Sequence, residues 1–199
     1  LPFPLAAPSA NPSGYISPTT AQHVAQQLGH KIPYILDGGA APVGLESTII
    51  GMEPDGQIKL YRLGGLAIEE IEEITGPLLR HEGATDSPQS SGMLKSHYAP
   101  QAELYLGDIL KLHSLHQGPA TRYLVFQEKY ASISADHQHV LAPSGVVKEA
   151  AQRLFDLLRQ LDEDPDCQII LAEKVPHQGL GLAINDRLDR AQSKFKGMV

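Results

Sequence analysis

The second half of the sequence alternates short apolar segments with longer amphipathic ones, and this alternation limits the folds open to it. The short segments have the length and composition of strands and lie at 102–106, 122–126, 139–142 and 168–172. The longer segments have helical periodicity and lie at 108–116, 146–161 and 182–195. Strands that alternate with helices predict an α/β fold, in which a mostly parallel sheet carries helices on both faces.

The first 79 residues follow a less regular pattern. They predict a helix at 18–28, a strand at 32–36, a hairpin of strands 47–52 and 57–62, and a small amphipathic helix at 67–74. Ser17 would cap the first helix, Pro18 would occupy its first turn and Gly29 would follow its end. The hairpin would bring Ser47 and Arg62 to the same side, because these residues begin and end it.

A linker separates the two halves of the chain. Residues 80–100 are rich in Gly, Ser and Pro and show neither helical nor strand periodicity, which is typical of a connecting segment. The predicted division is therefore a first part at 1–79, a linker at 80–100 and a second domain at 101–199.

The composition excludes several classes of protein. The net charge is −7 and the 16 Lys and Arg residues are scattered, whereas a surface for duplex nucleic acid needs clustered cations. Cys167 is the only cysteine, so it forms neither an internal disulfide nor a Cys-rich metal site, and a reducing, cytoplasmic compartment is expected. No apolar run reaches the roughly 18 residues that a membrane helix needs, so no membrane partner is expected.

Several polar side chains occupy positions that a core would not accommodate. Ser9 and Asn11 lie in a Pro-Ser-Ala-Asn motif, and they either organise a turn or face a ligand. Thr19 falls in the first turn of the predicted helix, where backbone N–H groups favour an anion, although the same segment suits a plain helix cap. Ser47 is the less strand-like of the two residues that open the hairpin. Arg62 ends a strand beside two glycines and can either fork onto phosphate oxygens or form a surface ion pair.

The order of these motifs resembles the YrdC/Sua5 family of threonylcarbamoyl-AMP synthases, which start the threonylcarbamoyladenosine modification of tRNA. Two further segments carry the resemblance: residues 91–100 are similar to the interdomain linker of the family, and residues 179–188 are similar to the end of its C-terminal domain. The resemblance implies that 1–79 is the C-terminal portion of a YrdC-like α/β catalytic domain and that 101–199 is a Rossmann-like Sua5 domain.

The resemblance also implies an activity. The family reaction joins L-threonine, bicarbonate and ATP, with Mg²⁺, into threonylcarbamoyl-AMP and pyrophosphate, so the chain would belong to a nucleotidyltransferase. Such a reaction needs no protein nucleophile, and the site would act by positioning and charge stabilisation. A tRNA threonylcarbamoyl transferase would use the product, and little direct tRNA binding is expected at this net charge.

Site residues are carried over position by position from the matching motifs. Ser9 and Ser47 would hold L-threonine. The positions that would contact ATP are Asn11, Thr19, Arg62 and Tyr98. The linker would settle over the bound nucleotide as a lid and exclude water.

The sequence departs from the family pattern in two places. Family members carry a basic, phosphate-binding segment before the Pro-Ser-Ala-Asn motif, so we expect these 199 residues alone not to catalyse the reaction. In addition, Ser91 replaces a proline that is usual in the linker. The alternative is a non-catalytic regulatory module that binds a nucleotide or a partner protein.

Overall fold

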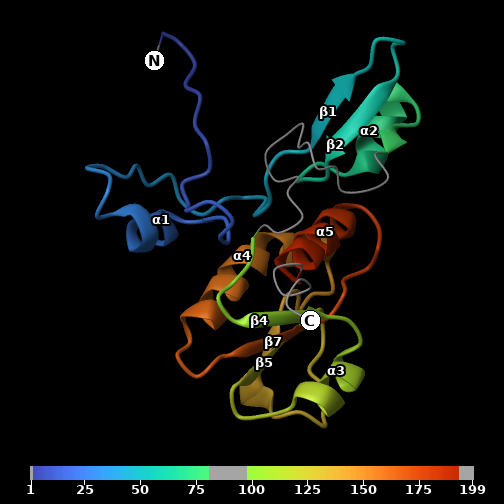
Figure 1. Cartoon of the computed structure of the whole chain (residues 1–199). Coiled ribbons are helices and arrows are strands. Elements are labelled where there is room, and N and C mark those ends of the chain that lie inside the picture. The colour runs from blue at the N-terminus through green and yellow to red at the C-terminus, as the bar shows by residue number, and fades with distance from the viewer. Residues whose placement is uncertain (1, 81–97, 193–199) are drawn as a thin grey trace.

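The computed structural model describes residues 2–80 and 98–192. These residues form two parts, each built on its own sheet, with the N-terminal part above the C-terminal part in Figure 1. Most of the linker predicted at 80–100 lies outside the described residues, so its role as a lid stays a prediction.

The C-terminal part is an α/β unit around a four-stranded parallel sheet. Its strands are β4 (Glu103–Leu106), β5 (Thr121–Val125), β6 (Gln138–Val140) and β7 (Ile169–Ala172). They lie side by side in the order β4-β7-β5-β6, and each neighbouring pair is parallel. The predicted α/β fold with a mostly parallel sheet is therefore confirmed, and each predicted strand overlaps the observed one.

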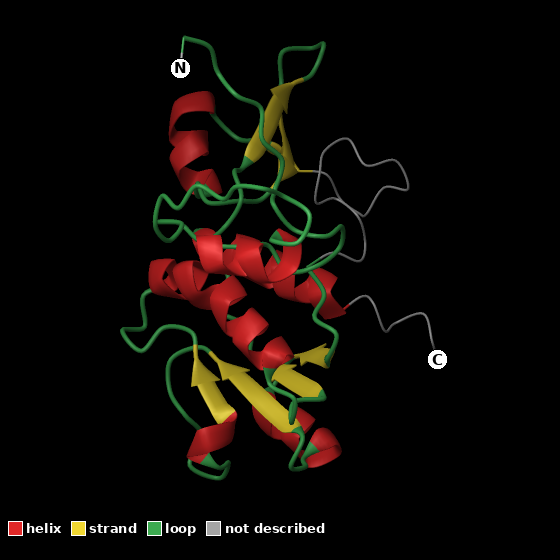
Figure 2. Ribbon diagram, turned by 90° about the vertical axis from the view of Figure 1, so that its left-hand side faces the viewer, coloured by secondary structure: helices red, strands yellow, loops and turns green. Residues whose placement is uncertain are grey.

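Helices cover both faces of this sheet, as the alternating pattern predicts (Figure 2). The helices of this part are α3 (Ile109–His116), α4 (Val147–Glu163) and α5 (Leu180–Gln192), with a short 3₁₀ turn η1 (Ala135–His137) before β6. On one face, Ile109 of α3 packs with Tyr123 and Leu171 of the sheet. On the other face, α4 and α5 bury the larger core and lie between the sheet and the N-terminal part.

The N-terminal part contains a small sheet with one helix packed on it. Its elements are α1 (Ala21–Leu28), β1 (Ile49–Met52), β2 (Ile58–Arg62), α2 (Ile68–Thr75) and β3 (Leu79–Arg80). β1 and β2 form the predicted antiparallel hairpin, and β3 pairs with β2 in parallel. The predicted amphipathic helix is α2, whose Ile68 and Ile71 pack with Leu60 and Leu78 in a core of their own.

Two local predictions for this part are wrong. The first is the cap of the first helix, which was predicted to be Ser17. α1 begins at Ala21 because Thr20 is its cap, with the Thr20 hydroxyl accepting a hydrogen bond from the His23 backbone at 3.2 Å. The hydroxyl of Ser17 bonds to Glu46 instead. Residues 32–36 do not form a strand, since no strand among the described residues lies alongside to pair with their backbone.

A fully buried arginine of α4 joins the two parts. Arg159 is 1% exposed, and it donates to the carbonyls of Ile16 and Ser17 in the N-terminal part. Its guanidinium lies 5.2 Å from the centre of the Tyr15 ring. Ile16 is completely buried in the same core cluster as Leu154 of α4, so a short N-terminal segment completes the C-terminal core.

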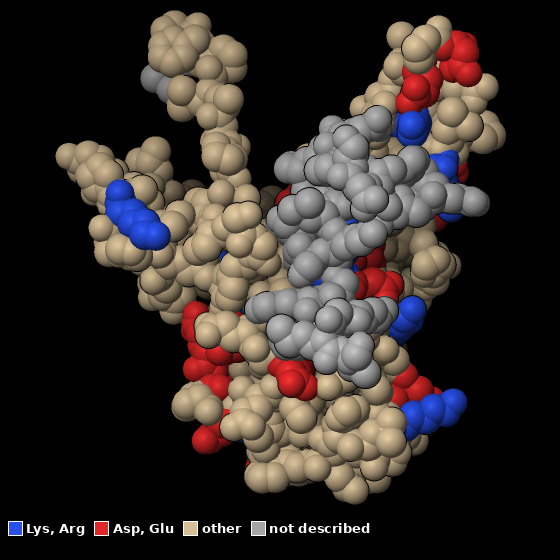
Figure 3. Space-filling view, viewed as in Figure 1, with Lys and Arg blue, Asp and Glu red and all other residues tan. Residues whose placement is uncertain are grey.

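The described residues on the face in Figure 3 form no single field of positive charge. On the face in Figure 3, Lys and Arg side chains of the described residues are scattered among acidic and uncharged ones. Within residues 2–80 and 98–192, no helix combines the length and the apolar character that crossing a bilayer requires.

Candidate functional site

A first cavity, of about 230 Å³, brings together polar residues from the start of the chain. Ser9 and Thr19 both line it, together with Ser17 and Glu46, and Phe155 of α4 forms part of its wall. The structure therefore places a predicted threonine contact and a predicted ATP contact around one space, although they lie ten positions apart in the sequence.

Thr19 is held in place by a histidine one helical turn further on. Its backbone N–H donates to His23 Nδ1 at 3.1 Å, and His23 Nε2 lies 3.2 Å from an Asp156 oxygen on α4. Because Nδ1 accepts, the proton of the neutral ring resides on Nε2 and points to Asp156. Burial and the nearby charge of Arg159 lower the pKa of His23, against the opposing effect of Asp156. The neutral ring thus links Thr19 to α4.

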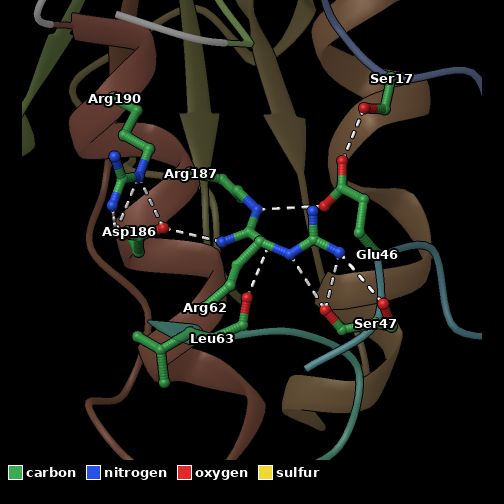
Figure 4. Close-up of polar contacts among 8 residues, drawn as sticks. All are labelled: Ser17, Glu46, Ser47, Arg62, Leu63, Asp186, Arg187 and Arg190. Carbon is green, nitrogen blue, oxygen red and sulfur yellow. Dashed lines mark hydrogen bonds and ion pairs between the residues drawn. The ribbon is translucent and has the colours of Figure 1, made fainter. Parts of the chain in front are cut away.

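A second group is formed by Ser47 and Arg62, which contact each other directly (Figure 4). Arg62 Nε and Nη2 donate to the carbonyl of Ser47 at 3.1 and 3.0 Å, and Nη2 also donates to the Ser47 hydroxyl at 3.1 Å. The hairpin explains the contact, because Ile49, close to Ser47, is the register partner of Arg62. The prediction that Ser47 and Arg62 lie on the same side is confirmed.

Gly64 permits this close approach of the two segments. A Cβ at this position would lie closer than 3.0 Å to the backbone of Ser47 and Thr48 and to the carbonyl of Glu46. The next residue, Gly65, donates its N–H to that same carbonyl at 2.7 Å. The glycines that follow Arg62 in the sequence therefore let the chain pass directly against the segment that carries Ser47.

Arg62 also lines a second, larger cavity of about 340 Å³ between the two parts of the molecule. Its charged and polar walls come from β2, β3 and α5 and from the loop before α5. They include Arg80, His177, Asp186, Asp189 and Arg190. Arg190 is oriented by Asp186, to which its Nε donates at 3.0 Å. Three arginines and two aspartates thus line this cavity, and the arginines offer N–H donors to an anionic group of a ligand.

A buried charge network lies between the first cavity and the Ser47–Arg62 pair. Arg187 of α5 is 0% exposed, and its Nε donates to Glu46 Oε2 at 3.2 Å while its Nη1 donates to Asp186 at 2.7 Å. Ser17 donates its hydroxyl proton to the other Glu46 oxygen at 2.6 Å. Burial of Glu46 opposes its ionisation, but Arg187 and Ser17 outweigh it and the pKa of Glu46 lies below its ordinary value. Glu46 is therefore charged at neutral pH.

Asn11 and Tyr98 lie outside the linings of these two cavities. Asn11 donates from its amide nitrogen to the carbonyls of Pro12 and Tyr15, each at 3.1 Å. Tyr98 is 1% exposed; its ring stacks on Phe155 with centroids 5.5 Å apart, and the Arg187 guanidinium lies 5.1 Å from its centre. The ATP contacts carried over to these two residues stay predictions.

Three residues of the site, Glu46, His23 and Arg187, have no role predicted from the sequence. Glu46 directly precedes Ser47, and Arg187 lies in the 179–188 motif, on a helix whose apolar face marks it as packed. A charged residue on such a face indicates a buried ion pair, because a charge is buried only together with its partners. Those partners come from the other part of the chain and are visible only in the fold.

Across residues 2–80 and 98–192, no group of three or more His, Cys, Asp and Glu side chains is arranged to hold a metal ion.

The fold and the two cavities define a class of protein. Oriented arginines and hydroxyls on an α/β scaffold are typical of proteins that bind small anionic ligands. Residues 66–193 match the family model described as threonylcarbamoyl-AMP synthase, C-terminal domain, and residues 1–64 match the Sua5/YciO/YrdC model, described as telomere recombination. The chain belongs to the Sua5/YrdC family of threonylcarbamoyl-AMP synthases, so the resemblance inferred from the motifs is confirmed.

Curated relatives from bacteria, archaea and fungi carry the same name. The threonylcarbamoyl-AMP synthase of Bacillus subtilis is 39% identical over 199 residues, which cover 95% of this chain and 57% of the relative. That of Pyrococcus abyssi is 38% identical over 197 residues, covering 94% and 57%. That of Schizosaccharomyces pombe is 35% identical over 227 residues, covering 96% and 52%. The chain therefore spans somewhat more than half the length of these relatives.

A solved structure confirms the fold. The crystal structure of P. abyssi Sua5 complexed with L-threonine superposes with a TM-score of 0.77 at 35% identity, over 93% of this chain and 56% of that one.

Proposed function

We propose that the protein to which this chain belongs is an L-threonylcarbamoyladenylate synthase, a nucleotidyltransferase. It would convert L-threonine, bicarbonate and ATP into threonylcarbamoyl-AMP and pyrophosphate for tRNA threonylcarbamoyladenosine synthesis. The names of the relatives support this activity, as does the complex of P. abyssi Sua5 with L-threonine.

The chemistry requires two substrates side by side. The threonine amine adds to the bicarbonate carbon and water leaves, which gives a carbamate. A carbamate oxygen then bonds to the α-phosphorus of ATP as the bond from that phosphorus to pyrophosphate breaks. No protein nucleophile is needed, so the contribution of the chain is to orient both substrates and to stabilise the phosphate charge.

The direct contact between Ser47 and Arg62 carries the proposal. The hydroxyl assigned to threonine lies 3.1 Å from the guanidinium assigned to ATP, so substrates held by these two groups would be neighbours. Ser9 and Thr19, which are likewise assigned to one substrate each, both line the 230 Å³ cavity. Asn11 and Tyr98 complete the proposed ATP contacts. Pairing of the two kinds of contact is what a reaction between threonine and ATP demands.

Mg²⁺ is proposed to enter as the MgATP complex. This ion keeps several waters and binds mainly through substrate phosphates, with few protein ligands. The phosphates would lie near Arg62 at the edge of the 340 Å³ cavity, where Arg80 and Arg190 add positive charge.

The product would pass to a tRNA threonylcarbamoyl transferase in the cytoplasm. Threonylcarbamoyl-AMP is a mixed anhydride, which water hydrolyses easily, so rapid use by a second enzyme is favoured. The acidic balance of the chain, with a net charge of −7, supports little direct binding of tRNA.

Pyrophosphate release tests the proposal. The protein at its natural length should release pyrophosphate from ATP only when both threonine and bicarbonate are present, and leaving out either should abolish the signal. A protein that binds ATP, measured by calorimetry, but releases no pyrophosphate under these conditions would instead be the regulatory module. Release that continues without threonine would refute the assignment as well.

A further inference from the structure

Arg187, on the C-terminal helix α5, contacts both backbone segments that carry the proposed substrate residues (Figure 4). Its partner Glu46 immediately precedes Ser47, and its partner Leu63 immediately follows Arg62. We propose that Arg187 is a positioning residue of the synthase, which holds the threonine-binding and ATP-binding segments in register with each other. This inference rests on the proposed function.

The geometry leaves little freedom to the two segments. Arg187 Nη2 donates to the carbonyl of Leu63 at 2.7 Å, and Nε donates to Glu46 at 3.2 Å. The planar guanidinium fixes the directions of its N–H bonds relative to one another, so it sets the relative position of the two segments. Arg62 then closes the arrangement by donating to the carbonyl of Ser47.

Burial makes these contacts obligatory. Arg187 is 0% exposed, so water cannot replace a lost partner, and Asp186 and the ring of Tyr98 complete its surroundings. A buried charge that loses one partner is strongly destabilised. The guanidinium and Glu46 therefore stay together as long as the protein is folded.

A positioning role and a purely structural role of Arg187 predict different kinetics for a variant that lacks it. Loss of structure reduces the amount of active enzyme, which lowers the maximal rate and leaves KM unchanged. Displacement of Ser47 and Arg62 weakens binding, so the KM values for threonine and ATP both rise. It also misaligns the substrates, and a shift of about 1 Å at such a site costs about a hundredfold in rate.

The test compares Arg187→Met with Arg122→Met in the protein at its natural length. Arg122 is the matched control because it is also buried, is bonded to Asp164 at 2.9 Å and to the carbonyl of Pro119 at 2.9 Å, and lines neither cavity. Rates are divided by the folded fraction from circular dichroism at the assay temperature. We expect KM for both substrates to rise about fivefold or more in Arg187→Met and to stay within about twofold in Arg122→Met.

Glu46→Gln provides a second variant if Arg187→Met does not fold. It keeps the shape of the side chain and a carbonyl oxygen for Ser17, and it replaces the charged oxygen that accepts from Arg187 by an uncharged NH2 group, which cannot accept. We expect both KM values to rise in this variant too, by less than in Arg187→Met. KM values equal to those of wild type, in whichever of the two variants folds, overturn the inference and leave the proposed function standing. An inactive wild-type protein overturns both.

Discussion

Replacing Gly64 by alanine should separate the two segments that carry Ser47 and Arg62. The added Cβ would lie closer than 3.0 Å to backbone atoms of Ser47 and Thr48, and no flexible side chain is among its nearest neighbours. Ordinary carbon contacts need about 3.5–4.0 Å, so the backbones must move apart by about 1 Å. Overpacking of this kind lowers the free energy of unfolding by about 1–3 kcal/mol.

The fall in kcat should be larger than the lower free energy of unfolding alone would cause. The same shift would lengthen the hydrogen bonds from Arg62 to Ser47, which are 3.0 and 3.1 Å long. We expect kcat to fall about a hundredfold, because the two proposed substrate sites would no longer be aligned.

Urea unfolding and pyrophosphate release measure the two effects, and Gly38→Ala is the control. Gly38 has open space where a Cβ would be placed, and its φ lies outside the left-handed region that strains other residues. If Gly64→Ala matches Gly38→Ala in both unfolding free energy and kcat, the close approach of the two segments is not needed and the reasoning is refuted.

Three further predictions concern other side chains. Arg62→Ala should raise KM for ATP more than KM for threonine, since a charged phosphate contact contributes about 1.5–3 kcal/mol, while Ser47→Ala should show the reverse; equal effects in steady-state kinetics would contradict the assignment. The lowered pKa of His23 means that the unfolded chain binds protons at higher pH than the folded one, so stability should fall as the pH drops below about 6.5. Urea unfolding at about pH 7.5 and about pH 5.5 should show a larger loss for wild type than for His23→Gln, and equal losses would exclude this contribution. Burial raises the pKa of the Cys167 thiol to about 11, so iodoacetamide at about pH 8 should label the folded protein far more slowly than the urea-unfolded protein, as followed by mass spectrometry.

The sequence predicts those features of the fold that depend on local periodicity. The four strands and three helices of the C-terminal part repeat apolar residues at spacings that each element imposes, and they appear near the predicted places. The strand predicted at 32–36 fails for a reason outside the segment. Its composition suits a strand, but a strand also needs a neighbour, and none of the described strands supplies one.

In the candidate site, too, the sequence predicts the local contacts and not those that depend on the tertiary fold. The contact between Ser47 and Arg62 follows from a hairpin, so residues 15 apart in sequence could be paired in advance. The Arg187–Glu46 pair joins residues 141 apart, and its existence depends on how α5 docks against the N-terminal part. The displaced cap of α1 has the same origin, because Ser17 is bonded to Glu46 and not to the helix that follows it.

The burial of Ile16 in the C-terminal core means that the unit of folding is discontinuous along the chain. Ile16 shares that core with Leu154 and Leu188, although the strands and helices of that unit begin only at residue 103. A recombinant piece cut at the linker would lack this side chain, and removal of a buried isoleucine from a core costs about 2–5 kcal/mol. Chimaeras between relatives should therefore exchange residues 15–17 together with the C-terminal part, since the cut that the sequence suggests passes through a shared core.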